Sequence, residues 1–433
     1  MRTAPVVLTL LLVCAAAAGA AGTGGPGAVE ATTPTAEQAP PEPVPTAVTA
    51  VANGTDVTNR THVLSIPSEN VTNARIDEAR IDAGLAVGVE VNTSAERMET
   101  IALRQRITAA ETNDERQRRV LDGMNELEKR VVTLRTEHRT AIEGYASGEL
   151  GTRELLAELA RIKAESDALE RRLAVLEELA SETEGSTLDS DRIPALAFQL
   201  RAFDGPVRDR ALQASSGEAP PTRIYVAASE DGVVLSTVID GQYVREVYRG
   251  DLRSLQSGTV AMAENVTARS YPAIWAASTN PSGTGSGSTH IVDVPYATGN
   301  LTAFVDGGSE RVFKEYQRIR LANVTGGEVR ERTIDLTVRV NRTYAGGPLR
   351  IEVLDPGTGD PIDASVRIAA GNEGSVDVGT TGEDGVLWTV APRGTFVVTA
   401  IQEGSNDLST VEITSTEPVS VAEAYGSNDS GDD

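Results

Sequence analysis

Two heptad-spaced stripes of side chains constrain this chain more than any other feature of its sequence. Within each stripe, apolar or small side chains recur at alternating intervals of four and three residues, which places them along one face of a helix. The first stripe is Val120, Met124, Leu127, Val131, Leu134, His138, Ala141 and Tyr145, and the second is Leu155, Leu159, Ile162, Ser166, Leu169, Leu173, Leu176 and Ala180. Two stripes of equal length, joined by residues 146–152, predict an antiparallel coiled-coil hairpin over residues 115–181. The same stripes would also suit a coil formed between two chains.

The hairpin belongs to a helical region that we expect over residues 61–215. The pattern predicts a helix over residues 70–84 before the hairpin and short helices over 193–203 and 207–213 after it. His138 stands in the first stripe without another histidine or a cysteine one helical turn away. We therefore expect a core side chain there rather than a metal ligand.

Carboxylates strongly outnumber cationic side chains. The chain has 63 Asp and Glu against 39 Lys and Arg, a formal net charge of −24, and its only lysines are Lys129, Lys163 and Lys314. This balance argues against a nucleic-acid partner, because phosphate binding needs clustered cations. An acidic, lysine-poor composition resembles the proteome of salt-loving archaea, although an ordinary acidic secreted protein is an alternative. Repulsion among the carboxylates is costly at low salt and is screened at molar salt, where the Debye length is about 3 Å.

The first 22 residues predict an export signal of the general secretory type. Arg2 precedes an almost unbroken apolar run over residues 5–18, and small residues follow. The single cysteine, Cys14, lies inside this run, so a processed chain would hold no disulfide and no thiolate metal site. An uncleaved signal or a lipid on Cys14 would be the only membrane anchor that we expect.

Two further segments have compositions that cannot bury a core. Residues 23–60 are rich in Thr, Pro, Ala and Gly and predict a disordered, extended linker. Residues 418–433 predict an acidic disordered tail.

Nine Asn-X-Ser/Thr sequons also favour an extracellular location. Chance would place about two or three in a chain of this composition. The possible N-glycosylation sites are Asn53, Asn59, Asn70, Asn92, Asn265, Asn300, Asn323, Asn341 and Asn428.

Residues 222–330 predict a small α+β domain. The hairpin turn at residues 230–232 separates two apolar runs rich in β-branched side chains. We expect strands over 223–228, 233–239, 242–249, 291–294 and 301–305, a flexible Gly/Ser loop over 283–288 and a helix over 310–320.

Residues 331–417 alternate short apolar strands with turns, which predicts an Ig-like β-sandwich. The segments IEVLDPGTGDPIDASVRI and TTGEDGVLWTVAPRGTFVVTA resemble the transthyretin-like, carboxypeptidase-regulatory-like family of surface modules. We expect Trp388 and Phe396 to fill the core. The resemblance implies a structural or binding appendage without peptidase activity. The fold class expected for the whole chain is therefore α+β multidomain: an N-terminal helical hairpin, a mixed α/β middle region and a C-terminal Ig-like sandwich.

The sequence contains no recognisable catalytic constellation. There is no H-E-x-x-H motif and no G-x-S-x-G elbow, and the three histidines, His62, His138 and His290, stand in separate regions. Acidic clusters at residues 189–191 and 355–363 lack the spacing of a calcium loop and are typical of a solvated surface. We therefore expect no catalytic, metal or cofactor-binding residues and no cofactor.

Taken as a whole, the sequence resembles uncharacterised secreted surface proteins of haloarchaea. The function we expect is that of a non-catalytic scaffold or interaction module at the cell surface. Its partners would be surface proteins such as the surface layer, or a second copy bound through the coiled coil. One alternative is a hydrolase or enzyme-accessory protein with a carboxylate site in residues 222–330, and another is a ligand-binding ectodomain.

Overall fold

The computed structural model describes residues 62–183, 191–371, 374–405 and 407–421. The expected signal peptide, the linker and most of the acidic tail lie outside these residues. Among the described residues, no helix is both long enough and apolar enough to cross a membrane.

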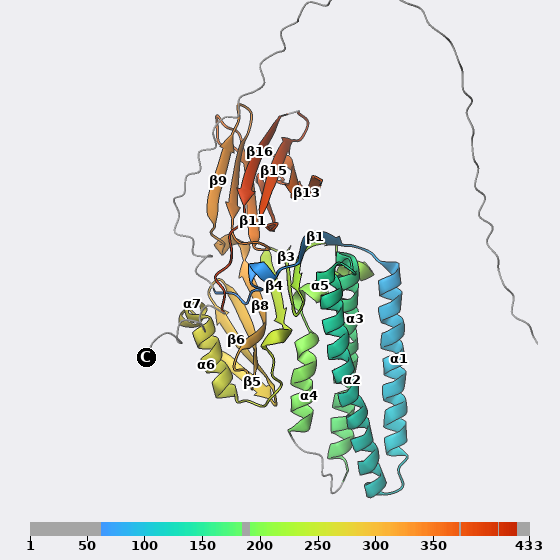
Figure 1. Ribbon diagram of the computed structural model, residues 1–433. Helices are drawn as coiled ribbons and strands as arrows, with labels where there is room; N and C mark the ends of the chain where they lie inside the picture. The colour runs from blue at the N-terminus through green and yellow to red at the C-terminus, as the bar shows by residue number, and fades with distance from the viewer. Residues whose placement is uncertain (1–61, 184–190, 372–373, 406, 422–433) are drawn as a thin grey trace, which may run out of the picture. The chain divides into compact units, whose positions relative to one another are not determined.

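An eight-stranded sheet forms the centre of the described chain (Figure 1). Its order is β1-β2-β3-β4-β8-β7-β6-β5, and every neighbouring pair is antiparallel. The strands are β1 (Asn73–Ala79), β2 (Thr222–Ser229), β3 (Gly232–Ile239), β4 (Gln242–Arg249), β5 (Ser282–Ser286), β6 (Thr289–Tyr296), β7 (Gly299–Asp306) and β8 (Val312–Arg320).

Three expectations about local structure were wrong in this sheet. The segment expected as a helix over 70–84 contains β1, which pairs with β2 along its whole length. The helix expected over 310–320 is β8, and the loop expected over 283–288 contains β5. The two misassigned helices have the same cause: pairing with distant strands overrides weak local helix propensity.

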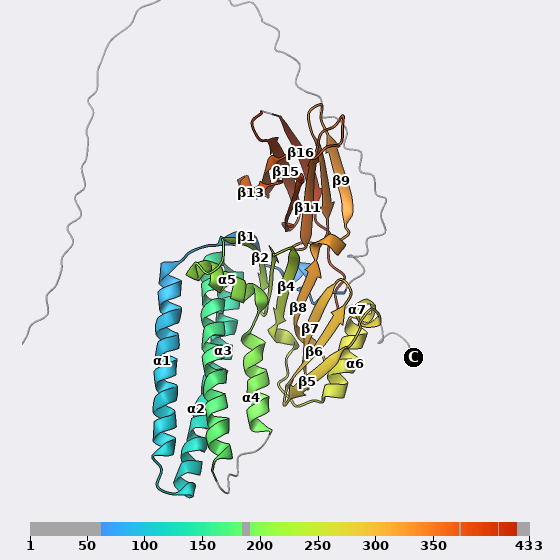
Figure 2. The same ribbon diagram turned by 180° about the vertical axis from the view of Figure 1, so that it is seen from behind.

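Seven α-helices of the described residues complete the central body. Their bounds are α1 (Ala83–Thr108), α2 (Asn113–Ser147), α3 (Thr152–Ser181), α4 (Arg192–Leu200), α5 (Pro206–Ser216), α6 (Val260–Ser270) and α7 (Pro272–Ala276). Helices α1 to α5 lie on one side of the sheet, and α6 and α7 lie on the other (Figures 1 and 2). On the first side, α2, α3 and α5 pack on β2, β3 and β4, where Tyr145, Leu156 and Val207 meet Val226 and Leu235 in one apolar cluster.

The two heptad stripes lie on helices α2 and α3. All sixteen stripe positions are buried within the single chain. The helices run side by side, and α1 and α4 add Leu103, Ile107 and Leu200 to their shared core. Burial in a bundle with these extra helices does not require a supercoil, so the coiled-coil geometry stays a prediction.

The C-terminal strands form two four-stranded antiparallel sheets, as expected for an Ig-like sandwich. One sheet has the order β14-β11-β10-β9 and the other β13-β12-β15-β16. The strands are β9 (Gly327–Arg332), β10 (Thr337–Arg342), β11 (Pro348–Leu354), β12 (Ala364–Ala370), β13 (Val376–Thr380), β14 (Val386–Val390), β15 (Thr395–Gln402) and β16 (Leu408–Thr414). Phe396 is buried in the core between them, as expected.

Trp388 does not fill the sandwich core and instead packs against the core of the central sheet. The loop between β10 and β11 strengthens this contact, because the carbonyl oxygen of Gly346 accepts hydrogen bonds from the hydroxyls of Ser236 and Tyr243, the latter at 2.8 Å. Gly346 has a φ of +73°, and a Cβ there would lie 2.5 Å from the ring of Tyr225. Glycine is therefore required for this close approach.

Candidate functional site

Charged side chains are buried at the centre of the sheet on its helix-covered side. Arg208 donates from Nε to Glu246 Oε1 at 2.5 Å, and its Nη1 lies 2.9 Å from His138 Nε2. Because an arginine only donates, this Nε2 accepts, and the proton of a neutral His138 lies on Nδ1. Burial, followed by the nearby Arg208 charge, lowers the pKa of His138 well below its ordinary value of 6.5.

Lys314 reaches the same cluster from β8. A bulge opposite β7 places Phe313 and Lys314 on the same face, and the ammonium donates to the carbonyls of Ala202, at 2.6 Å, and Asp204. Burial, followed by the Arg208 charge, lowers the pKa of Lys314 from 10.5 to about 7.

A second buried pair lies on the opposite face of the same two strands. Arg245 bonds to Glu315 Oε1, and Glu315 Oε2 accepts from the Tyr271 hydroxyl and the Leu64 amide, both at 2.6 Å. Burial raises the pKa of Glu315, although Arg245 opposes this effect.

Neither buried cluster offers a reacting group to a substrate. His138, Arg208, Glu246, Lys314, Arg245 and Glu315 are each at most 2% exposed. The arginines pair with Glu246 and Glu315, and Lys314 donates to backbone carbonyls, an arrangement that allows charged groups to stay inside a protein. Three atoms of the first cluster, His138 Nδ1, Arg208 Nη2 and Glu246 Oε2, have no hydrogen-bond partner among the described residues. We interpret both clusters as parts of the core.

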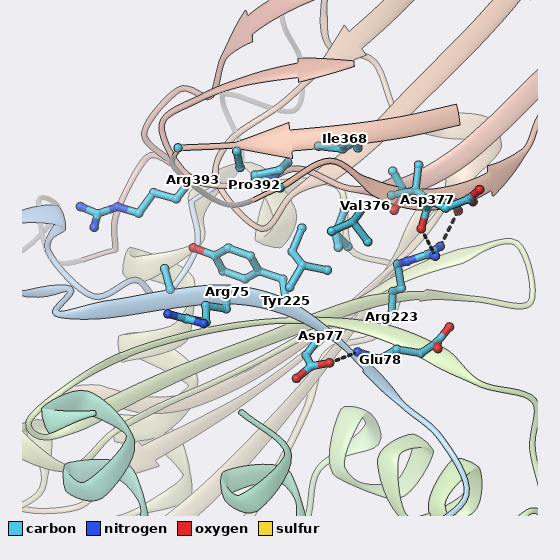
Figure 3. A pocket seen from close by; sticks show the side chains of 18 of the residues that line it. Arg75, Asp77, Glu78, Arg223, Tyr225, Ile368, Val376, Asp377, Pro392 and Arg393 are labelled. Atoms are coloured by element: carbon cyan, nitrogen blue, oxygen red, sulfur yellow. Dashed lines mark hydrogen bonds between the residues drawn. The ribbon is translucent and has the colours of Figure 1, made fainter. Parts of the chain in front are cut away.

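A cavity of about 600 Å³ lies between the β1–β2 edge of the central sheet and the C-terminal sandwich. Figure 3 shows Tyr225 between β1 and the sandwich strands, with Ile368 and Val376 on the sandwich side. Ala74 and Ile76 of β1 also line it. Apolar side chains therefore form part of the wall on both sides of the cavity, and a volume of this size is typical of ligand-binding sites.

Four arginines also line the cavity, in a chain that is otherwise strongly acidic. They are Arg75, Arg153, Arg223 and Arg393, and the acidic lining residues are Asp77, Glu78 and Asp377. Arg153 Nη2 lies 3.6 Å from Asp77 Oδ1. The cavity thus combines apolar side chains with four guanidinium groups and three carboxylates.

Two of the arginines are held by backbone carbonyls. Arg223 donates to the carbonyls of Asp377 and Val378 on β13 (Figure 3). Arg393 donates from Nη2 to the Ser68 carbonyl at 2.6 Å and from Nη1 to the Val71 carbonyl at 3.4 Å. These bonds orient the guanidinium groups but leave their charge without a described carboxylate in ion-pair contact.

Tyr225 supplies a polar group beside the apolar lining. It is only 3% exposed, and burial raises the pKa of its phenol above the ordinary value of 10. The phenol therefore keeps its proton over the whole range in which the protein would work and can both donate and accept a hydrogen bond.

The structure places six of the nine expected sequons, and none is buried. Asn70, Asn92, Asn265 and Asn323 are exposed, and Asn300 and Asn341 are half-buried. Asn53, Asn59 and Asn428 lie outside the described residues. Surface exposure is necessary for glycosylation, which itself stays a prediction.

The acidic cluster at residues 355–363 serves the turns of the sandwich. Asp355 accepts from the amides of Gly357 and Thr358, both at 2.7 Å, and Asp363 accepts from the Gly382 amide at 2.9 Å. Within the described ranges, no group of three or more His, Cys, Asp or Glu side chains converges in a way that could hold a metal ion.

Three family models match consecutive parts of the chain. Residues 1–220 match the Domain of unknown function (DUF7096), residues 224–325 match the Family of unknown function (DUF7094), and residues 328–408 match the Archaeal fibronectin-III type-like domain. The first match covers more than half of the 433 residues. The chain belongs to the DUF7096 family. No curated protein and no solved structure matches it.

The three matched regions meet at the cavity. The DUF7096 region contributes β1 and Arg153, the DUF7094 region contributes Tyr225, and the fibronectin-III-like region contributes Val376 and Arg393. The last match confirms an Ig-like module at the C-terminal end. Sequence reasoning did not find this site, because its residues come from three distant segments with no shared motif.

Proposed function

We propose that this protein is a non-catalytic interaction protein, exported to the surface of a halophilic archaeal cell, and that it binds its partner at the cavity between β1 and the sandwich. The observation that carries the proposal is the arginine-lined cavity where the three family regions meet. The four arginines of the lining outnumber its three carboxylates although the chain has a net charge of −24, so a binding role explains them better than chance.

The remaining architecture supports an interaction role. The helical region would serve as a rigid spacer, and the resemblance of the C-terminal module to carboxypeptidase-regulatory-like domains favours a binding appendage. The export signal and exposed sequons support a surface location. The carboxylates buried at the sheet centre, Glu246 and Glu315, pair with arginines, which favours a structural role over the hydrolase alternative.

Single-cysteine crosslinking in intact cells tests this proposal. In a Cys14→Ser background, Val376→Cys places a thiol in the cavity wall, and Leu408→Cys is the matched control. The two native side chains lie on opposite edge strands of the same sheet, with exposed fractions of 56% and 55%. A membrane-impermeant maleimide should label both positions at native salt, which reports surface location. A photoactivatable maleimide should then yield a protein adduct from position 376 and not from 408.

If both positions gave equal adducts, or if position 376 gave none, the cavity would not be the contact surface. If neither thiol reacted in intact cells and both reacted after lysis, the protein would not be located at the cell surface. A second candidate, a ligand-binding ectodomain, is favoured by the volume of the cavity. If the protein is a ligand-binding ectodomain, a small molecule should shield position 376 from the maleimide, and this position should form no protein adduct.

A further inference from the structure

Two strand edges face the same cavity. In the described chain, β1 is the outermost strand at one end of the central sheet, and β13 is outermost in its sandwich sheet. Residues 74–78 of β1 and 376–378 of β13 line the cavity together. An edge strand presents unpaired amide and carbonyl groups and is a template for another strand, so proteins normally blunt or cover such edges.

The edge of β1 is open along the cavity. The Glu78 amide turns away from β2 and donates to the Asp77 carboxylate at 2.8 Å. In an antiparallel strand, the N–H and C=O of one residue point to the same side, and the side alternates with each residue. The backbone groups of Ala74 and Ile76 therefore point outward like those of Glu78, and in the described residues they bond to no other segment.

The edge of β13 is already partly occupied. Arg223 donates to the carbonyls of Asp377 and Val378, which blunts this edge as an acceptor. Val376, next to these groups, keeps an apolar side chain that is 56% exposed. The two edges are thus unequal: β1 offers backbone hydrogen bonds, and β13 offers apolar surface and a fixed guanidinium group.

Charge indicates what kind of strand would fit. Neither Arg223 nor Arg393 forms an ion pair with a described carboxylate, and each donates two hydrogen bonds to backbone carbonyls. Each guanidinium has five N–H donors, so further donors remain for a carboxylate. An occupant with acidic side chains would complete the site.

We propose that the cavity binds an extended acidic segment of another protein, which adds to the open edge of β1 as a further antiparallel or parallel strand. Alternate side chains of this segment pack between Ile76, Tyr225 and Val376, and its carboxylates bond to Arg223 and Arg393. About five residues, at roughly 3.3 Å each, match the length of β1 that faces the cavity. This inference rests on the proposed function and names the chemistry of the partner.

The test uses the full chain without its signal and a phage-displayed library of random nonapeptides, selected at about 2 M KCl. We expect enrichment of acidic sequences with alternating apolar positions. Fluorescence polarisation of the enriched peptides then compares Val376→Glu, which adds a repelling charge to the cavity wall, with Leu408→Glu on β16. The first should weaken binding at least roughly tenfold and the second less than about twofold.

A second variant addresses the backbone directly. Ile76→Pro removes an amide from the open edge, where proline leaves the pairing with β2 intact, and should also weaken binding at least roughly tenfold. Circular dichroism at the same salt checks that each variant is folded. Failure to enrich any peptide, or equal binding to Val376→Glu and Leu408→Glu, would overturn strand addition. A crosslink from position 376 without peptide binding would leave the proposed function standing.

The chain's own C-terminal segment is the competing occupant. Val421, the last described residue, bonds to Val63, a few residues before the Ser68 carbonyl that holds Arg393. A synthetic peptide of residues 422–433 serves as the competitor. Displacement of the selected peptides by this competitor, together with tighter peptide binding after deletion of 422–433, would assign the site to the chain's own tail and overturn the proposal of a partner protein.

Discussion

At the scale of single residues, the buried ammonium of Lys314 makes stability depend on pH. Its pKa is about 7 in the folded state and near 10.5 when the chain unfolds. Between these values the unfolded state binds one more proton, so the free energy of unfolding rises with pH, by up to about 1.4 kcal/mol per pH unit. The stability that the neutral Lys314 provides is fully present above the unfolded pKa of about 10.5. It is lost as the pH falls through the folded pKa of about 7, where the buried side chain becomes charged.

The measurement is guanidinium unfolding between about pH 7.5 and 9.5 at molar salt, a range in which few other groups titrate. Lys314→Met should flatten the rise, and Lys129→Met, at an exposed lysine of α2, should leave it unchanged. If the free energy of unfolding rose with pH equally steeply in the two variants, Lys314 would not be the group that causes the rise.

Gly205 is required by the buried ion pair rather than by its backbone angle. A Cβ at this position would lie 2.0 Å from Glu246 Oε2, whose carboxylate is held by Arg208. We expect Gly205→Ala to displace the carboxylate and lower the free energy of unfolding by about 3 kcal/mol. Gly88→Ala, in the interior of α1 with no atom within 4 Å, should instead raise it by about 0.5–1 kcal/mol. Chemical denaturation compares the two, and equal effects would contradict this account.

At the scale of elements, the helical stripes should carry much of the stability of the bundle. Leu169 of α3 is fully buried in the core that α1 to α4 share, and Val132 of α2 is 57% exposed. We expect Leu169→Ala to lower the free energy of unfolding by about 2–5 kcal/mol and Val132→Ala by less than about 0.5 kcal/mol. The midpoint of denaturation should not change with protein concentration, because the stripes are buried within one chain. A concentration-dependent midpoint would favour a coil between two chains.

The same stripes explain how much of the fold the sequence could predict. Helical periodicity is local, so α2, α3, α4 and α5 were found close to their observed bounds. The strand β8 was missed because its charged residues are paired inside the protein: Lys314 and Glu315 point to opposite faces and meet partners from distant segments. The strand β1 was missed because its partner, β2, follows more than a hundred residues later. Neither buried charge pairing nor pairing with a distant strand produces a periodic pattern in the sequence.

The candidate site was beyond prediction for a related reason. Arg223 and Arg393 stand in segments that read as an ordinary strand and turn, and only the docking of the sandwich on the sheet brings them to one cavity. Trp388 did carry a local signal, a large aromatic residue in a strand, but it packs on the neighbouring sheet instead of its own core. The side of a strand that faces a second domain cannot be told from sequence alternation alone.

At the scale of the whole molecule, net charge should set the dependence of stability on salt, and two effects oppose each other. Salt weakens attractive pairs such as those that Arg172 of α3 forms with Glu96 and Glu99 of α1, at 2.6 and 2.8 Å. An ion pair at the protein surface typically contributes at most about 1 kcal/mol. Salt also screens the repulsion among the excess carboxylates of a chain with a net charge of −24, and this effect sums over the entire surface.

We expect screening of the repulsion to dominate, so the melting temperature should rise steadily from about 0.1 M to above 2 M KCl, as the Debye length falls from about 10 Å to below 3 Å. Glu90, Glu383 and Glu412 are exposed and form no ion pair with another residue that the structure describes, so their replacement with glutamine should stabilise the protein at low salt. At high salt, where the removed charges no longer interact, the triple variant should have the same melting temperature as the parent protein. Calorimetry over the salt series measures both. A melting temperature that stays constant or falls with added KCl would mean that the attractive pairs outweigh the excess charge, and the argument for a salt-adapted surface would fail.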